Sequence, residues 1–352
     1  MTLPEPKPTL RIIDANLNRI GEGLRLLEDV ARLLLNDTAL TQQLKTMRHE
    51  LIEGDWSFNQ WLLQIRDSAG DIGIDIEASV DKKQRCLPIT VVSNARRVQE
   101  SLRVIEELAK IPDTKLDSGK FKQARFNLYT IEQNLLSKLL RQNKMKHIPG
   151  LYVIMDTPAL KGLSHVKVAA QAIHGGAKVI QLRDKLHSKS ELLPIAQQLK
   201  NLCAEHKVLF IINDYLDLVL AADADGLHLG QNDLPISVVR KLLPMDKVLG
   251  CSTTTVDQAR IAESEGADYI AVGSIYPTSS KETAKVIGLD RLRQVRQAVT
   301  LPLVAIGGIT GDNAAEVIAA GADSVAVIRA VLETEAPEEA ARQITAKIGA
   351  PQ

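Results

Sequence analysis

The sequence predicts an α/β protein in which a (β/α)8 TIM barrel is preceded by a mainly helical domain with an internal two-fold repeat. Its 352 residues are enough for two domains of ordinary size. Near residue 147 a leucine- and arginine-rich helical pattern gives way to β-branched runs separated by glycine, and eight such runs follow. We therefore expect a helical repeat domain over 1–143, a linker over 144–150 and a barrel over 151–352.

The repeat in the first half is visible residue by residue. Residues 15–33 align with 93–111 at an offset of 78, so that the following residues recur: Asn16, Arg19, Glu22, Leu24, Arg25, Glu28 and Ala31 as Asn94, Arg97, Glu100, Leu102, Arg103, Glu106 and Ala109. The similarity continues at an offset of 77, where Lys45, Arg48 and Leu51 match Lys122, Arg125 and Leu128. Each copy is therefore predicted to be a pair of helices.

One stripe of the first helix is apolar at helical spacing: Ile13, Leu17, Ile20, Leu24, Leu27 and Ala31. Such a stripe cannot be buried alone, so we expect it to pack on the stripe of the second copy. Arg19, Glu22, Arg25 and Glu28 stand at i,i+3 spacing, which predicts surface ion pairs. Between the copies we expect a glycine-rich loop over 66–80 and an extended segment over 88–92.

The eight apolar runs of the second half are the predicted strands: 151–156, 178–184, 208–214, 226–230, 247–252, 268–275, 301–309 and 324–331. Their hydrophobicity is continuous, as in parallel strands that are buried on both faces. Eight βα units in about 200 residues is the size of a compact (β/α)8 barrel. A doubly wound sheet is the second choice, because it usually needs fewer strands.

Composition excludes several classes of protein. Lysine plus arginine and aspartate plus glutamate each number 43, and aromatic residues make up 3%, so we expect no nucleic-acid partner. No window approaches 18 consecutive apolar residues, so no membrane partner is expected. Cys86, Cys203 and Cys251 lack CxxC spacing, and the N-terminus lacks a signal-peptide pattern. We expect a cytoplasmic protein.

Cationic residues gather where the predicted strands end, which is where barrels carry their chemistry. Arg183 and Lys185 alternate with Asp184, so the two cations share one side of an extended chain. Lys281 lies after another strand, in a loop rich in hydroxyl groups. Salt bridges to neighbouring helices are the ordinary role of such residues, but three converging cations favour a bound anion.

Two aspartates stand at adjacent strand ends. Asp214 and Asp233 follow Asn213 and Asn232. Mg²⁺ is typically bound by only one or two protein carboxylates, and water and substrate phosphate complete its coordination shell. Each aspartate alone would equally suit a helix N-cap, and the pair beside the cations favours a metal. The seven histidines show no zinc spacing.

A second anion site is predicted after the last strands. Gly307-Gly308 and Ile328-Arg329 stand where barrels bind a phosphate monoester through backbone N–H groups. A tight turn would also explain the glycines, but the hydroxyl run 278–280 supports a phosphate site. The residues thus favour one metal-bound diphosphate and one monophosphate. No Ser-His-Asp order, catalytic cysteine or nicotinamide fingerprint competes with this interpretation.

The segments QLRDK, ND, HLGQND, GCS, PTSSK and AIGGI, in this order, resemble thiamine-phosphate synthase over residues 151 to about 335. The resemblance implies Mg²⁺-dependent condensation of 4-amino-2-methyl-5-hydroxymethylpyrimidine diphosphate with 4-methyl-5-(2-phosphoethyl)thiazole, which gives thiamine phosphate and pyrophosphate. It implies that the pyrimidine diphosphate is held by Gln181, Leu182, Arg183, Asp184, Lys185, Asn213, Ser252 and Lys281. The metal would be held by Asp214 and Asp233, and the thiazole phosphate by Thr278, Ser279, Ser280, Gly308, Ile328 and Arg329.

The expected mechanism is a dissociative substitution in which Arg183, Lys185 and Lys281 are catalytic, because they stabilise the departing pyrophosphate. Lys281→Ala is expected to lower kcat about 10²- to 10³-fold. Two positions depart from the family pattern. Ser280 stands where threonine is common, and Arg329 stands where serine is frequent, so the backbone N–H of Arg329 is the expected ligand, and whether its side chain adds charge at the monophosphate is left open. A thiazole tautomerase-like barrel and a non-catalytic sensor of thiamine precursors are the alternatives.

The first half resembles the helical domain that is fused to some of these synthases and associated with hydroxymethylpyrimidine-phosphate kinase activity. This implies a bifunctional enzyme whose first half makes the pyrimidine diphosphate. The residues contain no P-loop or protein-kinase signature, so ATP is not placed. Asn16, Asn94 and the segment Arg66-Asp67-Gly70-Asp71 are functional candidates. A dimerisation module is the alternative, since a duplicated apolar stripe would also suit a homo-oligomer.

Overall fold

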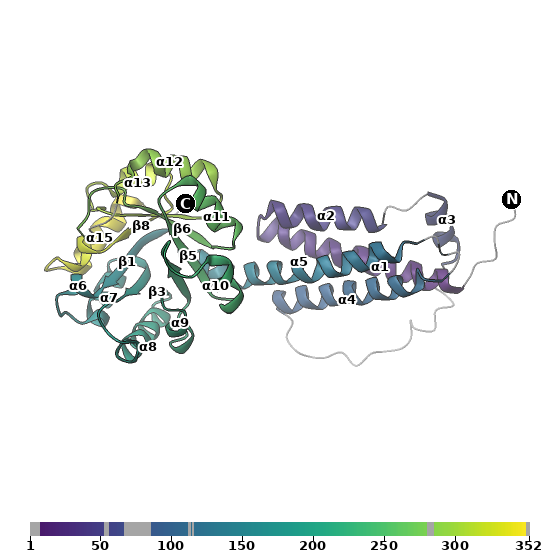
Figure 1. Cartoon of the computed structure of the whole chain (residues 1–352), viewed down its shortest axis with the longest axis horizontal. Helices are drawn as coiled ribbons and strands as arrows, with labels where there is room; N and C mark the ends of the chain where they lie inside the picture. Colours follow the sequence, from purple (N-terminus) through teal and green to yellow (C-terminus); the bar gives the residue numbers. More distant parts are fainter. Residues whose placement is uncertain are drawn as a thin grey trace. The chain divides into compact units, whose positions relative to one another are not determined.

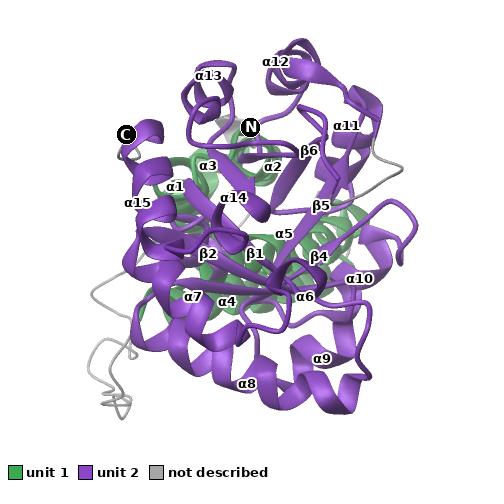
Figure 2. Ribbon diagram, turned by 90° about the vertical axis from the view of Figure 1, so that its left-hand side faces the viewer, with its two compact units in different colours: residues 1–140 green, residues 141–352 purple. Residues whose placement is uncertain are grey.

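The structure, a computed structural model, describes residues 8–52, 56–66, 86–111, 114, 116–279 and 285–349. It divides into two compact units, Met1–Leu140 and Arg141–Gln352, which are coloured separately in Figure 2. Along the sequence, the boundary between the two units, at Leu140 and Arg141, lies just before the predicted linker. Since the last helix of the first half continues to Met145, the first two residues of 144–150 are helical, and the exact domain boundaries stay a prediction.

The first unit is helical, as the sequence predicts (Figure 1). Its helices are α1 (Pro8–Asp29), the π-helix η1 (Val30–Leu34), α2 (Thr38–Ile52), α3 (Trp56–Gln64), α4 (Leu87–Leu108) and α5 (Ser118–Met145). The repeat corresponds to α1 with α2 and to α4 with α5. The predicted extended segment over 88–92 is wrong, because these residues begin α4. Pro88 stands in the first turn, where its missing N–H is not needed, and Val91 is buried in the core.

The predicted apolar stripe is the core of this unit. Five of its six residues are fully buried and Leu17 is partly buried, and α1 packs against α4. At their contact a Cβ on Gly23 would lie 2.4 Å from Cγ2 of Val98, so only glycine permits this approach of the two helices. The pairing of the two stripes within one chain is thereby confirmed.

The charged row is not wholly on the surface. Glu28 is buried, and its carboxylate accepts a hydrogen bond from Arg48 on α2 at 2.9 Å. The equivalent residues of the second copy, Glu106 and Arg125, make the same ion pair at 3.0 Å. The surface interpretation is therefore wrong for Glu28, because its side chain faces the neighbouring helix rather than solvent.

The functional candidates of the first half have local partners. The side-chain amides of Asn16 and Asn94 each donate to a carbonyl one turn back in their own helix, at 2.8 and 2.9 Å. Arg66 forms a two-bond ion pair with Asp14, at 2.7 and 2.8 Å. Asp67, Gly70 and Asp71 lie outside the described residues, as does the rest of the predicted loop up to residue 80.

The second unit is a closed barrel of eight parallel strands in sequence order, and β8 pairs with β1. All eight predicted strands are present, so the doubly wound alternative is wrong. The strands are β1 (Gly150–Asp156), β2 (Ala177–Arg183), β3 (Leu209–Asn213), β4 (Gly226–Leu229), β5 (Val248–Thr253), β6 (Tyr269–Gly273), β7 (Leu303–Ile306) and β8 (Ser324–Val327). The last run, 324–331, is a strand only to Val327, because a helix begins at Arg329.

Helices surround these strands, as Figures 1 and 2 show. They are α6 (Thr157–Leu160), α7 (His165–His174), α8 (Lys189–Glu205), α9 (Leu216–Ala221), α10 (Ile236–Leu242), α11 (Val256–Ser264), α12 (Gly288–Ala298), α13 (Ala314–Ala319), α14 (Arg329–Leu332) and α15 (Pro337–Ile348). One apolar layer packs between strands and helices, and a second fills the barrel interior around Tyr152 and Tyr269. Across the described chain, no helix is long and apolar enough to cross a membrane.

Candidate active site

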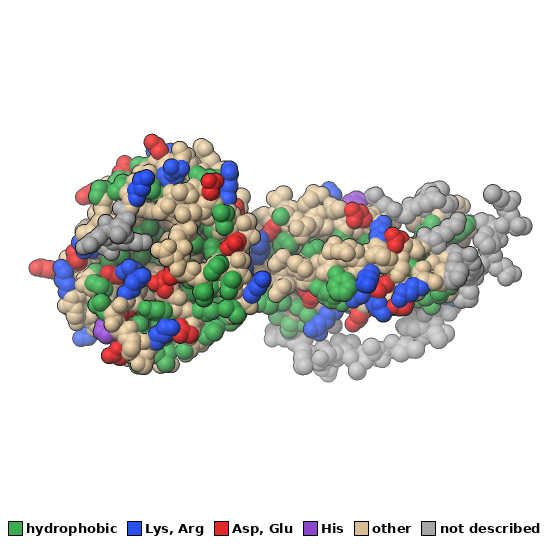
Figure 3. Space-filling model, in the orientation of Figure 1, with side chains coloured by type: hydrophobic (Ala, Val, Ile, Leu, Met, Phe, Trp, Pro, Cys, Tyr) green, Lys and Arg blue, Asp and Glu red, His purple; other side chains and the backbone are tan. Residues whose placement is uncertain are grey.

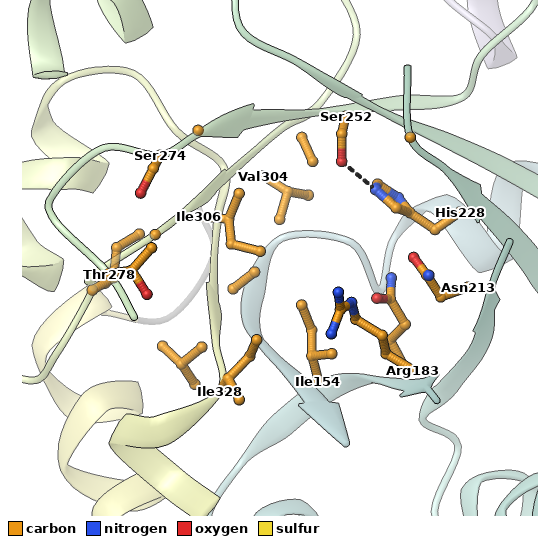
Figure 4. Close-up of a pocket in the computed structure, with 18 of the residues that line it drawn as sticks. Ile154, Arg183, Asn213, His228, Ser252, Ser274, Thr278, Val304, Ile306 and Ile328 are labelled. Atoms are coloured by element: carbon orange, nitrogen blue, oxygen red, sulfur yellow. Dashed lines mark hydrogen bonds between the residues drawn. The ribbon is translucent and has the colours of Figure 1, made fainter. Parts of the chain in front are cut away.

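The ends of the strands surround a cavity of about 670 Å³. Most of the predicted site residues line it together: Gln181, Arg183, Lys185, Asn213, Asp214, Asp233, Ser252, Thr278, Ser279, Gly307, Gly308, Ile328 and Arg329. In Figure 4, Arg183, Asn213 and His228 lie on one side, and Ser274 and Thr278 lie on the opposite side. Ile306 and Val304 lie between them, so apolar side chains separate the two polar sides of the cavity.

Two predicted substrate ligands, Leu182 and Asp184, have side chains outside this lining. Leu182 packs in the layer under the helices, and Asp184 is buried outside the cavity. The physical reason is the alternation of a strand, which turns Gln181 and Arg183 inward and their neighbours outward. Ser280 and Lys281 lie outside the described residues.

Asp184 organises the loop that carries Lys185. Its carboxylate accepts hydrogen bonds from the backbone N–H groups of Leu186 and His187, at 2.7 and 2.9 Å, and from the hydroxyl of Thr157. Burial alone would raise the pKa of Asp184, but the hydrogen bonds from Thr157 and His187 outweigh it and lower this pKa to about 2. The ionised carboxylate therefore stabilises the folded loop.

Asp184→Asn is expected to lower the free energy of unfolding by about 2 kcal/mol at pH 5. Because the pKa of Asp184 is lower in the folded chain than in the unfolded chain, where it is near 4, the ionised carboxylate stabilises the fold above pH 4. This stabilisation is lost as the pH falls toward 2. The difference in free energy of unfolding between wild type and variant should thus be about 1 kcal/mol smaller at pH 3 than at pH 5. Urea unfolding at both pH values measures it, with the exposed Asp312 changed to Asn as control. A gap that does not depend on pH would contradict this role.

The cations of β2 are held by carboxylates of neighbouring strands. The Arg183 guanidinium donates to Asp156, which ends β1 and is buried. Lys185 Nζ lies 3.4 Å from an oxygen of Asp214. Sequence reasoning missed Asp156, although it ends the first apolar run and could have been compared with the other strand-end carboxylates. The pairing aims Arg183 along the cavity wall (Figure 4).

Asp214 and Asp233 come together at the ends of β3 and β4. Asp214 has a φ of 65°, and its N–H donates to the carbonyl of His228 at 2.9 Å, while Asp233 accepts from the N–H of Gly230 at 2.6 Å. Burial and the adjacent carboxylate of Asp233 raise the pKa of Asp214. Two carboxylates this close favour a shared cation. The described residues hold no group of three or more His, Cys, Asp and Glu side chains suited to a metal, so the pair stands alone.

A chain of buried hydrogen bonds crosses the cavity floor. Gln181 donates to the hydroxyl of Tyr152 at 2.7 Å, the hydroxyls of Tyr152 and Tyr269 lie 3.0 Å apart, and Tyr269 lies 2.9 Å from Nδ1 of His228. Nε2 of His228 lies 2.8 Å from Oγ of Ser252 (Figure 4). Sequence reasoning noted His228 only as a buried strand residue and missed both tyrosines.

The direction of these hydrogen bonds determines whether the Ser252 hydroxyl can donate into the cavity. One direction of this chain gives every proton an acceptor: Gln181 donates to Tyr152, Tyr152 donates to Tyr269, and Tyr269 donates to Nδ1 of His228. Burial lowers the pKa of His228 to about 4, so the ring is neutral and carries its proton on Nε2, which donates to Ser252. The Ser252 hydroxyl is then free to donate into the cavity.

Tyr269→Phe is expected to lower the free energy of unfolding by about 1–3 kcal/mol, because it leaves buried Nδ1 of His228 without its donor. Urea unfolding measures it. The matched control is Tyr276→Phe, whose hydroxyl contacts Glu316 at the surface and should cost less than about 1 kcal/mol. Equal losses of unfolding free energy in the two variants would show that the buried hydrogen bonds add no stability beyond that of a surface hydroxyl.

The opposite side of the cavity is built from backbone and hydroxyl groups. Gly307 and Gly308 have φ values of 103° and 65°, and a Cβ on Gly308 would lie 2.5 Å from the carbonyl oxygen of Pro277, so glycine is required there. The side chain of Arg329 reaches across and donates to Ser279. The guanidinium of Arg329, whose role at the monophosphate the sequence left open, thus also lines the cavity. Lys285 lines this region too and was missed.

Comparison with known proteins decides the family. Residues 151–331 match the family described as thiamine monophosphate synthase. The chain belongs to the thiamine-phosphate synthase family. A thiamine-phosphate synthase from Synechocystis sp. is 38% identical over 348 residues, which cover 99% of this chain and 98% of the relative. Another from Nostoc sp. is 39% identical and covers 93% of this chain and 90% of the relative.

The two units each have a counterpart. The solved structure of a thiamine phosphate pyrophosphorylase from Pyrococcus furiosus is 39% identical, with a TM-score of 0.53, and covers 58% of this chain and 96% of that chain. Residues 11–134 match the ThiD2 family. The family resemblance and fold stated from the sequence are thereby confirmed. The chain is an enzyme of this family, a transferase of thiamine biosynthesis with a second, kinase-like helical part.

Proposed function

We propose that the barrel condenses the aminopyrimidine diphosphate with the thiazole phosphate, releasing pyrophosphate and forming thiamine phosphate. The observation that supports this most is the two-sided cavity. Cations and paired carboxylates occupy the ends of β2 to β4, while glycine backbone, hydroxyls and Arg329 occupy the ends of β6 to β8. A reaction between two anionic substrates needs both sides at once.

The diphosphate would lie between Arg183, Lys185 and the two aspartates. Asp214 and Asp233 fit Mg²⁺, because two adjacent carboxylates, which raise the pKa of Asp214, need a cation and leave other coordination positions for water and phosphate. When bound, Mg²⁺ supplies positive charge that helps to neutralise the diphosphate. Arg183 adds a planar donor pair, held in place by Asp156.

The substitution itself breaks one bond and makes one. The C–O bond between the pyrimidine methylene and the diphosphate breaks, its electron pair leaves with pyrophosphate, and the ring carries the developing positive charge. The thiazole nitrogen then forms the new C–N bond to the methylene carbon. Arg183 and Lys185 stabilise the negative charge on the leaving group, and the Ser252 hydroxyl offers a preorganised donor.

The assay that tests this uses the purified chain, both substrates and Mg²⁺. Thiamine phosphate and pyrophosphate should appear in equal amounts. The two alternatives give other results. A thiazole tautomerase-like barrel would convert the thiazole phosphate without needing the pyrimidine diphosphate, and a sensor would bind both ligands and release no pyrophosphate. Either result would overturn the proposal.

For the helical unit we propose phosphorylation of the pyrimidine monophosphate by ATP, which supplies the barrel's substrate. The match of residues 11–134 to the ThiD2 family, on the same chain as a synthase barrel, supports this. The apolar stripe that suggested a dimerisation module is used within the chain, between α1 and α4, which favours a catalytic role.

The coupled reaction tests the kinase proposal. The whole chain, given the pyrimidine monophosphate, ATP, Mg²⁺ and the thiazole phosphate, should form ADP and thiamine phosphate. Omitting ATP should stop it, and adding the pyrimidine diphosphate should restore it. If thiamine phosphate forms only when the diphosphate is supplied, the helical unit is not this kinase.

A further inference from the structure

The helical unit has a pocket of its own, on the faces of α4 and α5. It has a volume of about 460 Å³ and is lined by Arg96, Gln99, Glu100, Arg103, Arg125 and Tyr129. Three arginines and one glutamate give this lining an excess of positive charge. Figure 3 shows basic, acidic and apolar side chains close together on the visible face of the unit. A surface of this kind suits an anionic ligand with an apolar part.

Two of the arginines are held in place by one buried carboxylate. Glu106 accepts from Arg103 at 2.7 Å and from Arg125 at 3.0 Å. The carboxylate side chain is only 4% exposed, whereas the Arg103 side chain is 53% exposed. Arg96 is exposed as well and forms no ion pair with any described residue. Arg103 also pairs with the exposed Glu107 at 2.6 Å, so the pocket combines two paired guanidinium groups with the unpaired one of Arg96.

Aromatic rings stand beside these cations, in a chain with only 3% aromatic residues. The Tyr129 hydroxyl accepts from Arg125 at 3.1 Å, and the ring of Phe126 lies 5.9 Å from that of Tyr129. Both rings are about half exposed. The Arg125 guanidinium lies 4.8 Å from the centre of the Phe126 ring. Half-exposed rings fixed by a cation offer a flat ligand a stacking surface.

The internal repeat separates what the fold needs from what this pocket adds. The first copy keeps the buried ion pair, as Glu28 with Arg48, so that pair serves the helix packing. At the positions of Arg96, Gln99 and Tyr129, however, the first copy has Asn18, Gly21 and Ile52. The free cation and the aromatic ring are thus found only in the second copy, and the buried ion pair of the helix packing does not involve them, whereas the amide of Gln99 donates to Glu132 of α5 at 2.5 Å.

We propose that this pocket binds a phosphorylated amino-heteroaromatic compound. The phosphate would be held by Arg96 and Arg103, the ring would lie against Tyr129, and Glu100 would accept from the amino group. The inference rests on the proposed kinase function of this unit and names its ligand site. An aminopyrimidine phosphate and an adenine nucleotide share this chemistry, and the experiment separates them.

Binding is measured by titration calorimetry of the whole chain, with every variant made in an Arg183→Ala background that weakens the barrel site. The titrants are the pyrimidine monophosphate and a non-hydrolysable ATP analogue. Arg96→Ala and Tyr129→Leu should each raise Kd at least tenfold for one of the two titrants, and that titrant identifies the source. Arg97→Ala, an exposed arginine of α4 outside the pocket lining, is the matched control and should change Kd less than twofold.

Folding of the helical unit is checked by circular dichroism and urea unfolding of the same variants, which should match wild type. Equal effects of Arg96→Ala and Arg97→Ala on Kd, or no effect of either pocket variant, overturn the site. If the chain turns over ATP and the pocket variants leave KM for the pyrimidine monophosphate and for ATP unchanged, the site is wrong while the kinase proposal stands. If no turnover occurs but the pocket variants abolish binding, the kinase proposal fails while the site stands.

Discussion

Replacing Arg183 by alanine is expected to lower kcat of the synthase reaction about 10²- to 10³-fold. The guanidinium is preorganised by Asp156 at the cavity wall, where the pyrophosphate leaves, so it meets the developing charge without rearrangement. An interaction made mainly in the transition state lowers kcat, whereas one made equally in the ground state raises KM. Steady-state release of pyrophosphate, at varied concentrations of both substrates, separates the two effects.

The control is Lys189→Ala. This lysine lies in α8, after the same loop, and its ion pair with Asp217 is exposed, so activity should stay within twofold. Asp156→Asn keeps Arg183 but weakens its positioning, and a loss between those of wild type and Arg183→Ala is expected. A loss under threefold for Arg183→Ala would mean that the diphosphate does not bind on this side of the cavity.

Removing divalent cations with a chelator is expected to lower the synthase rate at least about 10²-fold, and excess Mg²⁺ should restore it. Asp214 and Asp233 lie against each other, and Nζ of Lys185 lies 3.4 Å from an oxygen of Asp214. Without a metal ion, the diphosphate would face both carboxylates. Asp214→Asn should give a comparable loss that added Mg²⁺ does not fully reverse, while Asp217→Asn on the exposed face should not. Full activity after chelation would rule out the two-aspartate metal site.

The barrel could be predicted from the sequence because parallel strands buried on both faces leave continuous apolar runs, and each run here ends in polar residues. Arg183, Asp214 and Asp233 could be predicted as neighbours from these polar ends, because the strands of the closed barrel follow one another in sequence order and their ends lie side by side. The family resemblance pointed to Gly308 and Ile328, which also line the cavity. In these cases a local pattern was sufficient.

The differences between sequence and structure have physical reasons as well. Leu182 and Asp184 belong to a contiguous motif, but the alternation that begins in β2 turns their side chains away from the cavity. The segment 88–92 is rich in β-branched residues, but burial of Val91 against the neighbouring helices overrides its local preference for an extended chain. Glu28 belongs to a row that looks solvent-exposed until α2 brings Arg48 to it.

The chain of hydrogen bonds through Tyr152, Tyr269 and His228 could not be predicted, because its members come from three strands and meet only in the closed barrel. One sign was available: both tyrosines stand at inward-facing positions of apolar runs, where a hydroxyl needs a partner. A Cβ on Gly250 would lie 2.0 Å from the Tyr269 ring, so the glycine of β5 is what makes room for it.

The claim that the cavity has two separate anion sides is tested most directly by binding of the two ligands one at a time. Titration calorimetry measures Kd for pyrophosphate with Mg²⁺, and Kd for the thiazole phosphate, in wild type, Arg183→Ala and Arg329→Ala. Arg183→Ala should weaken pyrophosphate binding at least tenfold and leave the thiazole phosphate within twofold, and Arg329→Ala should do the reverse. If both variants weaken the same ligand, or if each weakens both ligands equally, the two-sided site is contradicted.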